Sequence, residues 1–319
     1  MQFHPGCYRI NTFYIRGKDR MRLADKVLRR LKRVPFTIYS GFRRWHYLRR
    51  QKAGRLVRHR LPGKAVINLY PEGQIAELLY TVRFEQAELA LVSACLKPGM
   101  KVVDIGANIG LYSIVADKAV KPKGRVWAFE PSSETYSRLI RNLSLNDATS
   151  VIPARLALAD KHGGSLTLKR DSGFRDGDRY LVAEKAARPL DSGWPEDYGD
   201  SEQVQVTTLD HYLYTLVDAP HRIDFLKMDI EGGEFSVFRG AKRVLTSNPE
   251  ILLMFECTPQ GCQRAGHKQE DVFKFLRDLG FGLYCWRRST RVWESGSEQL
   301  LAAGNVWACR GKELLPRLP

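Results

Sequence analysis

Short apolar runs alternate with amphipathic segments along most of the chain after residue 60. The apolar runs that predict strands are KVVDIG (101–106), RVWAFE (125–130), SVIPARLAL (150–158), IDFLKMDI (223–230), EILLMFE (250–256), FGLYCW (281–286) and NVWACR (305–310). The segments with helical spacing are FEQAELALVSACL (84–96), NIGLYSIVADKAV (108–120), SSETYSRLIRNLSLN (132–146), GEFSVFRGAKRVLTS (233–247) and QEDVFKFLRDLG (269–280). Strands that alternate with helical crossovers predict an α/β fold, with helices on both faces of a doubly wound, mostly parallel sheet.

The segment from Asp160 to Ile223 interrupts this regular pattern. It is longer than the other connections, and its alternating residues predict two short strands, at SLTLKR (165–170) and VQVTTLD (204–210). We expect it to be less regular than the rest, and we refer to it as the irregular insertion.

Composition is that of a globular protein. The chain has 319 residues, of which 44% are hydrophobic, enough for one large domain with an appendage. It contains no run of eighteen apolar residues and no apolar stretch typical of a secretory signal, so we expect a cytoplasmic protein. The six cysteines are scattered, and we expect them to be reduced. Cys257, Cys262 and His267 lack a fourth ligand for zinc, so no metal is assigned to them.

The basic charge is concentrated at the N-terminus. Residues 1–60 contain 18 Lys and Arg against two Asp, a net charge of +16, and the 33 basic and 33 acidic residues that remain balance each other. We predict a basic amphipathic helix over residues 23–34, ended by Pro35, and a following segment in which aromatic residues interleave with arginines. The expected organisation is therefore a basic, partly helical N-terminal extension (1–60) and a second domain (61–319).

Two interpretations of this extension are equally favoured. It can contact an anionic membrane face, which would hold a cytoplasmic protein at the inner surface of the membrane. It can also pack on the second domain with its basic side in solvent. Nucleic acid is the less favoured partner, although basic and aromatic residues suit phosphates and bases as well.

The first predicted strand leads into a glycine turn that is typical of a nucleoside site. Gly106 and Gly110 leave backbone N–H groups facing a ligand, and Glu130 ends the second strand, where an acid accepts the hydroxyls of a ribose. Asn108 stands where a dinucleotide fingerprint requires its second glycine, which disfavours a nicotinamide cofactor. Asp104 and Asn108 instead suit the amino-acid tail of S-adenosylmethionine.

Five segments together resemble the FkbM-type S-adenosylmethionine-dependent methyltransferases: VVDIGANIGLYSIVA, VWAFEPSSETYSRLIRNLSLN, ALAD, TTLD and FLKMDIEGGEFSVFRGAKRVL. The matching blocks extend from about Phe84 to Glu256. The resemblance implies a Rossmann-like class I fold with a seven-stranded sheet whose last strand is reversed. It also implies cofactor-binding roles, at the methionine end for Asp104, Gly106, Asn108 and Gly110, at the ribose for Glu130 and at the adenine edge for Asp160.

Acidic side chains follow the fourth and fifth predicted strands, where the methyl group of this cofactor would lie. The candidate catalytic residues are Lys227, Asp229, Glu231 and Glu256. Lys227 and Asp229 are two positions apart, so they share one face of the strand and can form an ion pair. Transfer of a methyl group to a hydroxyl requires alignment and a proton acceptor, and we expect Asp229 to be that acceptor.

Several alternatives stay open around this acidic block. Glu234 can cap the following helix instead of acting in the site, and His211 and His221 are alternative bases. A divalent metal on Asp229 and Glu256 is conceivable by analogy with catechol-type O-methyltransferases, but two oxygen ligands are too few to assign one.

The acids in MDIEGGE favour an oxygen nucleophile over a nucleobase or amide nitrogen. The resemblance implies hydroxyls of sugars and natural products as acceptors, and Tyr180, Trp194 and Tyr198 in the irregular insertion suit a sugar. We therefore expect an O-methyltransferase of a sugar, a lipid-linked glycan or a glycosylated natural product. The alternatives are a methyltransferase of RNA or another macromolecule held by the basic extension, and a cofactor-binding scaffold without catalysis.

Overall fold

A central sheet of eight strands organises the protein. The computed structural model describes residues 36–70, 74–81, 85–170, 179–182, 201–216, 222–287, 289–296 and 305–316. The strands of the central sheet are β3 (Lys101–Ile105), β4 (Arg125–Phe129), β5 (Val151–Ala154), β10 (Phe225–Met228), β11 (Leu252–Glu256), β12 (Gly282–Arg287), β13 (Val292–Ser295) and β14 (Asn305–Cys309). Their spatial order is β13-β12-β14-β11-β10-β3-β4-β5.

The strand directions confirm the predicted doubly wound fold. The five strands from β5 to β11 are parallel, whereas β14 runs antiparallel to both β11 and β12. The last strand is therefore reversed, as expected. β13 is an eighth, edge strand that pairs only with β12 in this sheet. Its sequence did not predict it, because VWES is short and Val292 is half exposed.

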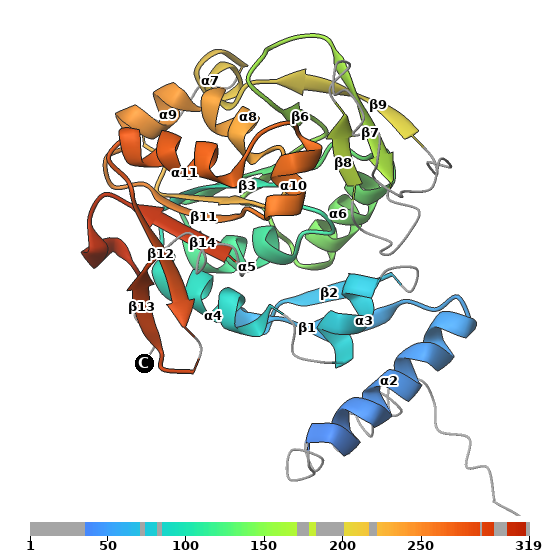
Figure 1. Ribbon diagram of the computed structural model, residues 1–319. Helices are drawn as coiled ribbons and strands as arrows, with labels where there is room; N and C mark the ends of the chain where they lie inside the picture. The colour runs from blue at the N-terminus through green and yellow to red at the C-terminus, as the bar shows by residue number, and fades with distance from the viewer. Residues whose placement is uncertain are drawn as a thin grey trace, which may run out of the picture.

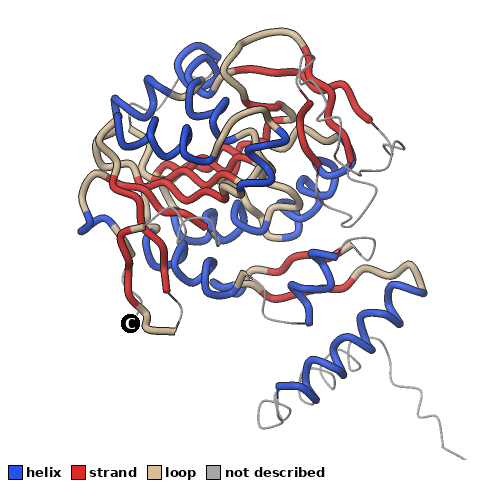
Figure 2. The backbone as a smooth tube through the Cα atoms, in the orientation of Figure 1, coloured by secondary structure: helices blue, strands red, loops and turns tan. Residues whose placement is uncertain are grey.

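Helices cover both faces of the sheet (Figures 1 and 2). On one face the buried side chains of α4 (Gln86–Cys95), α5 (Leu111–Val120) and α6 (Ser133–Leu145) share a hydrophobic cluster with the sheet. On the other face, α7 (Leu209–His211), α8 (Glu234–Arg239), α9 (Lys242–Ser247), α10 (Pro259–Arg264) and α11 (Gln269–Asp278) contribute to a second cluster. Alternate residues of each strand supply the two clusters, as the period of two requires.

Two predicted elements are divided in the structure. The expected strand over 150–158 becomes β5 and β6 (Ala157–Leu158). Only β5 joins the central sheet, as an edge strand where Pro153 needs no donor. The expected helix over 233–247 becomes α8 and α9. The break occurs at Gly240, where a Cβ atom would lie 2.0 Å from the carbonyl oxygen of Ala159.

The irregular insertion carries a second sheet. β6, β7 (Ser165–Arg170), β8 (Arg179–Val182) and β9 (Ser201–Thr207) form a four-stranded sheet in the order β6-β9-β7-β8. The two short strands predicted here correspond to β7 and β9. Trp194 and Tyr198 lie outside the described residues, and so does the side chain of Tyr180.

The N-terminal region adds a helix and a hairpin. α2 (Phe36–Lys52) precedes β1 (Val57–Arg60), which pairs antiparallel with β2 (Val66–Leu69), and α3 (Gln74–Thr81) follows. The expected boundary after residue 60 thus falls inside a hairpin. The helix predicted over 23–34 lies outside the described residues. Among the helices that the structure describes, none has the length and apolar character to cross a bilayer.

Two asparagines, one in α6 and one directly after it, attach the hairpin to the helices on one face of the sheet. The amide of Asn142 accepts from the N–H of Asn68 (2.9 Å) and donates to its carbonyl (3.3 Å), and Asn146 does the same with Val66 (2.8 and 2.6 Å). Asn142 also donates to the carbonyl of Ile109 (2.9 Å) in the glycine turn. The two side chains make backbone hydrogen bonds with β2 of the kind that a neighbouring strand would make. They also connect the N-terminal region to the candidate site.

Candidate active site

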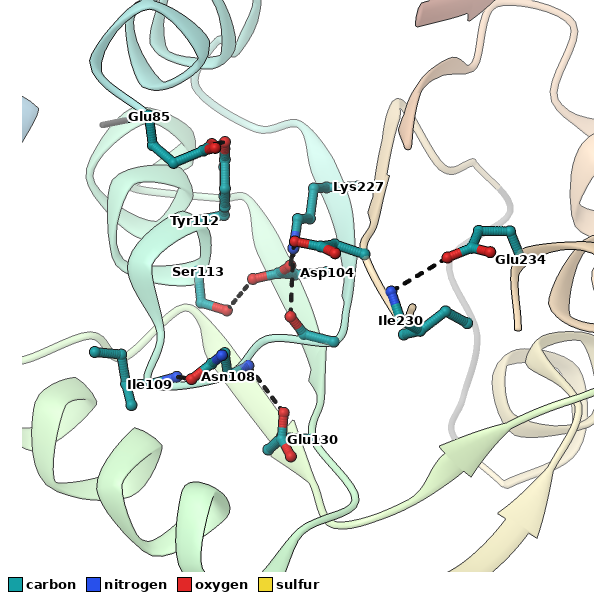
Figure 3. A network of polar contacts seen from close by, with 12 residues as sticks. Glu85, Asp104, Asn108, Ile109, Tyr112, Ser113, Glu130, Lys227, Ile230 and Glu234 are labelled. Carbon is teal, nitrogen blue, oxygen red and sulfur yellow. Dashed lines mark hydrogen bonds and ion pairs between the residues drawn. The ribbon is translucent and has the colours of Figure 1, made fainter. Parts of the chain in front are cut away.

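Strand register brings the candidate catalytic residues together. Asp104 of β3 lies directly opposite Lys227 of β10. Both occupy the positions of their strands that face α4 and α5, and Glu256 at the end of β11 has the same parity. The carboxyl ends of three neighbouring parallel strands therefore present charged side chains to one region. Figure 3 shows two of these side chains, Asp104 and Lys227, close together. Ligands of such sheets bind at this end.

Lys227 is a buried cation surrounded by acids. Its Nζ lies 3.6 Å from Asp229 Oδ2 and 3.9 Å from Asp104 Oδ1, and it donates to the carbonyl of Gly106 at 3.3 Å. Burial alone would lower the pKa of Lys227, but the surrounding carboxylates reverse the effect, so its pKa is raised. The predicted ion pair with Asp229 is present, and the lysine stays charged to balance the acids around it.

Glu85 and Tyr112 are site residues that the sequence analysis missed. Tyr112 on α5 donates a hydrogen bond to Glu85, and the Lys227 ammonium lies 4.9 Å from the centre of the Tyr112 ring (Figure 3). Glu85 precedes α4 with a φ of 60°, a conformation that non-glycine residues rarely adopt. Acidic residues are common at helix N-termini because they interact favourably with the helix dipole. The position of Glu85 in the sequence therefore gave no sign of a role in the site.

Two carboxyl groups of this region have pKa values near neutrality. Burial raises the pKa of Glu85 to about 7, against the hydrogen bond from Tyr112. Burial and the negative charges of Asp229 and Glu231 raise the pKa of Glu256 to about 8. Groups with such values exchange protons readily at neutral pH.

Glu130 stabilises the glycine turn. Its two carboxylate oxygens accept from the backbone N–H groups of Asn108 and Ser132, each at 3.0 Å. Figure 3 shows the hydrogen bond from Asn108. Asn108 has a φ of 49°, and its own side chain accepts from the N–H of Ile109 at 2.8 Å. The end of β4 and the turn after β3 are thus joined at the position predicted for the ribose.

The two glycines of the turn have different packing roles. A Cβ atom on Gly106 (φ 72°) would lie 2.0 Å from the carbonyl oxygen of Asp229, so this glycine allows the turn to approach the acidic block. A Cβ atom on Gly110 (φ 96°) would meet Leu139 of α6 at 2.8 Å. Gly110 therefore permits close packing of α5 on α6.

The loop after β10 is held by its own acids. Glu234 is buried and accepts from the N–H groups of Ile230 (3.4 Å) and Gly232 (3.2 Å), and burial raises its pKa to about 8. Glu231 forms an ion pair with Arg264 at 3.2 Å. Glu234 is the first residue of α8, but its carboxylate accepts from the loop before that helix, while Glu231 faces α10.

The remaining candidates lie elsewhere. Asp160 forms an ion pair with Arg239 of α8 at 2.5 Å, and its N–H donates to Ser236. His211 stacks on His162 beside β9, with ring centroids 3.5 Å apart, and His221 lies outside the described residues.

The structure describes a close thiol pair but no metal cluster. The sulfur atoms of Cys257 and Cys262 are 3.5 Å apart, and both side chains are buried. Within the described ranges, no group of three or more His, Cys, Asp or Glu residues is arranged to hold a metal ion.

The chemistry of the turn fits S-adenosylmethionine. Asp104 is buried and accepts from Ser113 at 2.5 Å, and its other oxygen lies 3.9 Å from the Lys227 ammonium, too far for a hydrogen bond. An acceptor of this kind suits an ammonium group, and the carboxylate of Glu130 suits ribose hydroxyls. Together with the reversed last strand, these groups define a Rossmann-like class I methyltransferase fold.

The comparison with family models assigns the chain within this class. The FkbM methyltransferase domain matches residues 104–283, more than half of the chain, and the protein therefore belongs to the FkbM methyltransferase family. Its domain is that of an S-adenosylmethionine-dependent methyltransferase, as the sequence motifs indicated.

Two relatives illustrate the extent of the similarity. Methyltransferase sdnD of Sordaria araneosa is 32% identical over 154 residues, which cover 44% of this chain and 59% of that protein. The hexuronic acid methyltransferase AglP of Haloferax volcanii is 23% identical over 175 residues, 55% of this chain and 60% of that protein. The chain thus spans about three fifths of the length of these relatives.

Among solved structures, the O-methyltransferase TomG from Streptomyces achromogenes is similar with a TM-score of 0.40 and 14% identity, over 70% of this chain and 79% of that chain. The SAM-dependent O-methyltransferase TM0748 from Thermotoga maritima has a TM-score of 0.39 and 13% identity, over 81% of this chain and 79% of that chain.

Proposed function

We propose that the protein is an S-adenosylmethionine-dependent O-methyltransferase that acts on a hydroxyl group of a sugar, a lipid-linked glycan or a glycosylated natural product. The observation that carries this proposal is the cluster of carboxyl groups around the buried Lys227, near the carboxyl ends of the strands. Its members are Asp104, Asp229, Glu256 and, from the start of α4, Glu85. An oxygen nucleophile loses a proton during methylation, and this cluster supplies acceptors for it.

The role of each residue in the reaction follows from its environment. S-Adenosylmethionine supplies a methyl group on a sulfonium that is already an activated leaving group. The protein's task is to align the acceptor hydroxyl and take its proton. Asp229 is partly exposed, with 41% of its side chain accessible, so an acceptor can reach it. Lys227 fixes the carboxylate of Asp229, and we assign Asp229 as the proton acceptor.

Glu85 and Glu256 give the site a pH dependence. Because their pKa values are raised to about 7 and about 8, both groups lose their protons as the pH rises through this range. Once ionised, both groups can themselves accept a proton, so the cluster is better able to take the proton of the acceptor hydroxyl. We expect kcat/KM to rise between about pH 6 and about pH 8.

The acceptor class is inferred from the chemistry of the site and from one relative. A cluster of acids provides hydrogen-bond acceptors for the several hydroxyl groups of a sugar. The name of AglP, a hexuronic acid methyltransferase, supports a sugar acid as one candidate at 23% identity. RNA is the alternative macromolecular acceptor, and the acids at the end of β10 disfavour it, because they would repel phosphates.

Mass spectrometry of glycans from the source cell, with and without the gene, tests this proposal. We expect one methyl ether on a sugar to be missing when the gene is absent. With the acceptor known, Asp229→Asn should reduce turnover by about a hundredfold while cofactor affinity stays close to that of the wild type.

Four outcomes would contradict the proposal or one of its parts. Unchanged glycans together with a missing methyl group on RNA would favour the alternative acceptor. Cofactor binding without any change in methylation would favour a scaffold. Wild-type turnover in Asp229→Asn would remove this residue from the mechanism. Loss of activity on chelation, with recovery on adding magnesium, would replace the simple base by a metal-assisted one.

A further inference from the structure

The helix α2 has two different faces. Its inner face is fixed to the protein: Tyr47 is fully buried, and His46 Nδ1 lies 2.9 Å from the Tyr80 hydroxyl on α3. Arg44 forms an ion pair with Glu77 at 2.9 Å, and the Arg43 guanidinium lies 3.9 Å from the centre of the Tyr80 ring. The helix is therefore held in a defined orientation on α3.

The outer face of α2 exposes large apolar side chains. Phe42, Trp45 and Leu48 follow one another at intervals of three residues, and their exposed fractions are 44%, 52% and 42%. Leu56, after the helix, is 38% exposed. Of the six large apolar side chains that are exposed among the described residues, four lie in this short segment. Such a concentration is not explained by folding, since it stabilises nothing that the structure describes.

Basic residues accompany the apolar stripe. Arg49 and Lys52 lie on the same side of the helix as Trp45, and the Arg49 guanidinium is 5.1 Å from the centre of the Trp45 ring. Residues 36–60 contain eight Lys and Arg and no acid. A second copy of this face would meet its own positive charge, so self-association is disfavoured.

We propose that the outer face of α2 binds the anionic surface of a lipid bilayer. Phe42, Trp45 and Leu48 insert at the boundary between headgroups and acyl chains, and Arg49 and Lys52 pair with the phosphates of anionic lipids. The cytoplasmic leaflet is rich in such lipids, so the protein attaches to the inner face of the membrane. Figure 1 shows α2 projecting from the body of the protein next to α3.

This inference does not depend on the acceptor of the methyl group. It combines the two sequence-based interpretations of the extension, since one face of α2 packs on the protein while the other carries the lipid contact. It places the protein where lipid-linked substrates occur, but a membrane-bound enzyme with a soluble acceptor would satisfy it equally.

Sedimentation with vesicles tests the proposal on the full chain. Wild-type protein should sediment with vesicles of phosphatidylcholine and phosphatidylglycerol but not with phosphatidylcholine alone. Salt should release it, because the screening length is about 8 Å at physiological ionic strength. Substitution of both aromatic anchors, Phe42→Ser with Trp45→Ser, should weaken partitioning into anionic vesicles by about tenfold or more.

A matched double variant serves as the control. Ile140→Ser with Val292→Ser removes two other exposed apolar side chains, which are 39% and 50% exposed on α6 and β13. This control should partition as the wild type does, and both double variants should keep the wild-type melting temperature and affinity for S-adenosylhomocysteine.

Three results would overturn the proposal. The first is wild-type partitioning in Phe42→Ser with Trp45→Ser, and the second is equal binding to vesicles without anionic lipid. The third is retention of RNA, reduced by the same two substitutions, with no vesicle binding in the same buffer. This last result would assign α2 to nucleic acid.

Discussion

Replacement of Lys227 by methionine tests how strongly the charges of the site depend on one another. Lys227 is 6% exposed and Asp104 is 1% exposed, so their contact is a buried ion pair. Removal of one partner from such a pair costs about 3 to 5 kcal/mol, because the remaining charge stays buried without compensation. The lost contact with the partly exposed Asp229 adds little. We therefore expect Lys227→Met to lower the free energy of unfolding by about 3 to 5 kcal/mol at neutral pH.

Urea denaturation of two further variants completes the test. Lys274→Met removes a lysine that is 74% exposed and paired with Asp278 at 2.7 Å, and it should cost less than about 1 kcal/mol. Lys227→Met combined with Asp104→Asn should recover a large part of the loss, because no uncompensated charge remains. At acid pH the loss should shrink in Lys227→Met, since Asp104 can then be protonated. Equal destabilisation by Lys227→Met and Lys274→Met, measured in the same buffer, would refute the reasoning.

Three more substitutions test the turn and the loop. Gly106→Ala should abolish cofactor binding and destabilise the fold far more than the control Gly163→Ala. Both glycines have a positive φ, but only a Cβ atom on Gly106 would meet a backbone atom, at 2.0 Å. Similar melting temperatures for the two variants would argue against the close approach. Glu234 has a folded pKa of about 8, so the folded state binds more protons than the unfolded one and stability falls as the pH rises toward 8. Glu234→Gln should therefore gain stability relative to the wild type from about pH 5 to about pH 8 in urea titrations, and a constant difference would contradict the pKa assignment. In calorimetry, Glu130→Ala should weaken binding of S-adenosylhomocysteine by about 1 to 3 kcal/mol. The control Glu134→Ala, on the exposed side of α6, should leave this affinity unchanged. Equal affinities of the two variants would remove Glu130 from the ribose site.

The fold could be predicted from the sequence because apolar periodicity determines it. Each strand of the central sheet apart from β13 is a short apolar run, and each long helix that crosses between parallel strands has an apolar stripe. The predictions of secondary structure were wrong or missing where apolar periodicity gives no signal. The division at Gly240 depends on its contact with Ala159, and α2 escaped prediction because its two faces are both rich in aromatic residues and arginines.

The candidate site could be predicted only in part. Motif spacing placed Asp104, Asp229 and Glu130 at the ends of strands, but only the register of β3 and β10 places Lys227 opposite Asp104. Glu85 reaches the site from the residue before α4 and contacts the Tyr112 hydroxyl. Contacts of this kind depend on packing between distant segments, which a single sequence does not encode in any local pattern.

Transfer of an isotope-labelled methyl group tests the central claim most directly. The protein would be incubated with S-adenosylmethionine whose methyl group carries deuterium, together with glycans, lipid-linked glycans and RNA from the source cell. We predict that the label appears as a methyl ether on a sugar and that Asp229→Asn slows its appearance by about a hundredfold. Label on a nitrogen of RNA, or no label in any fraction while the cofactor binds, would contradict the account.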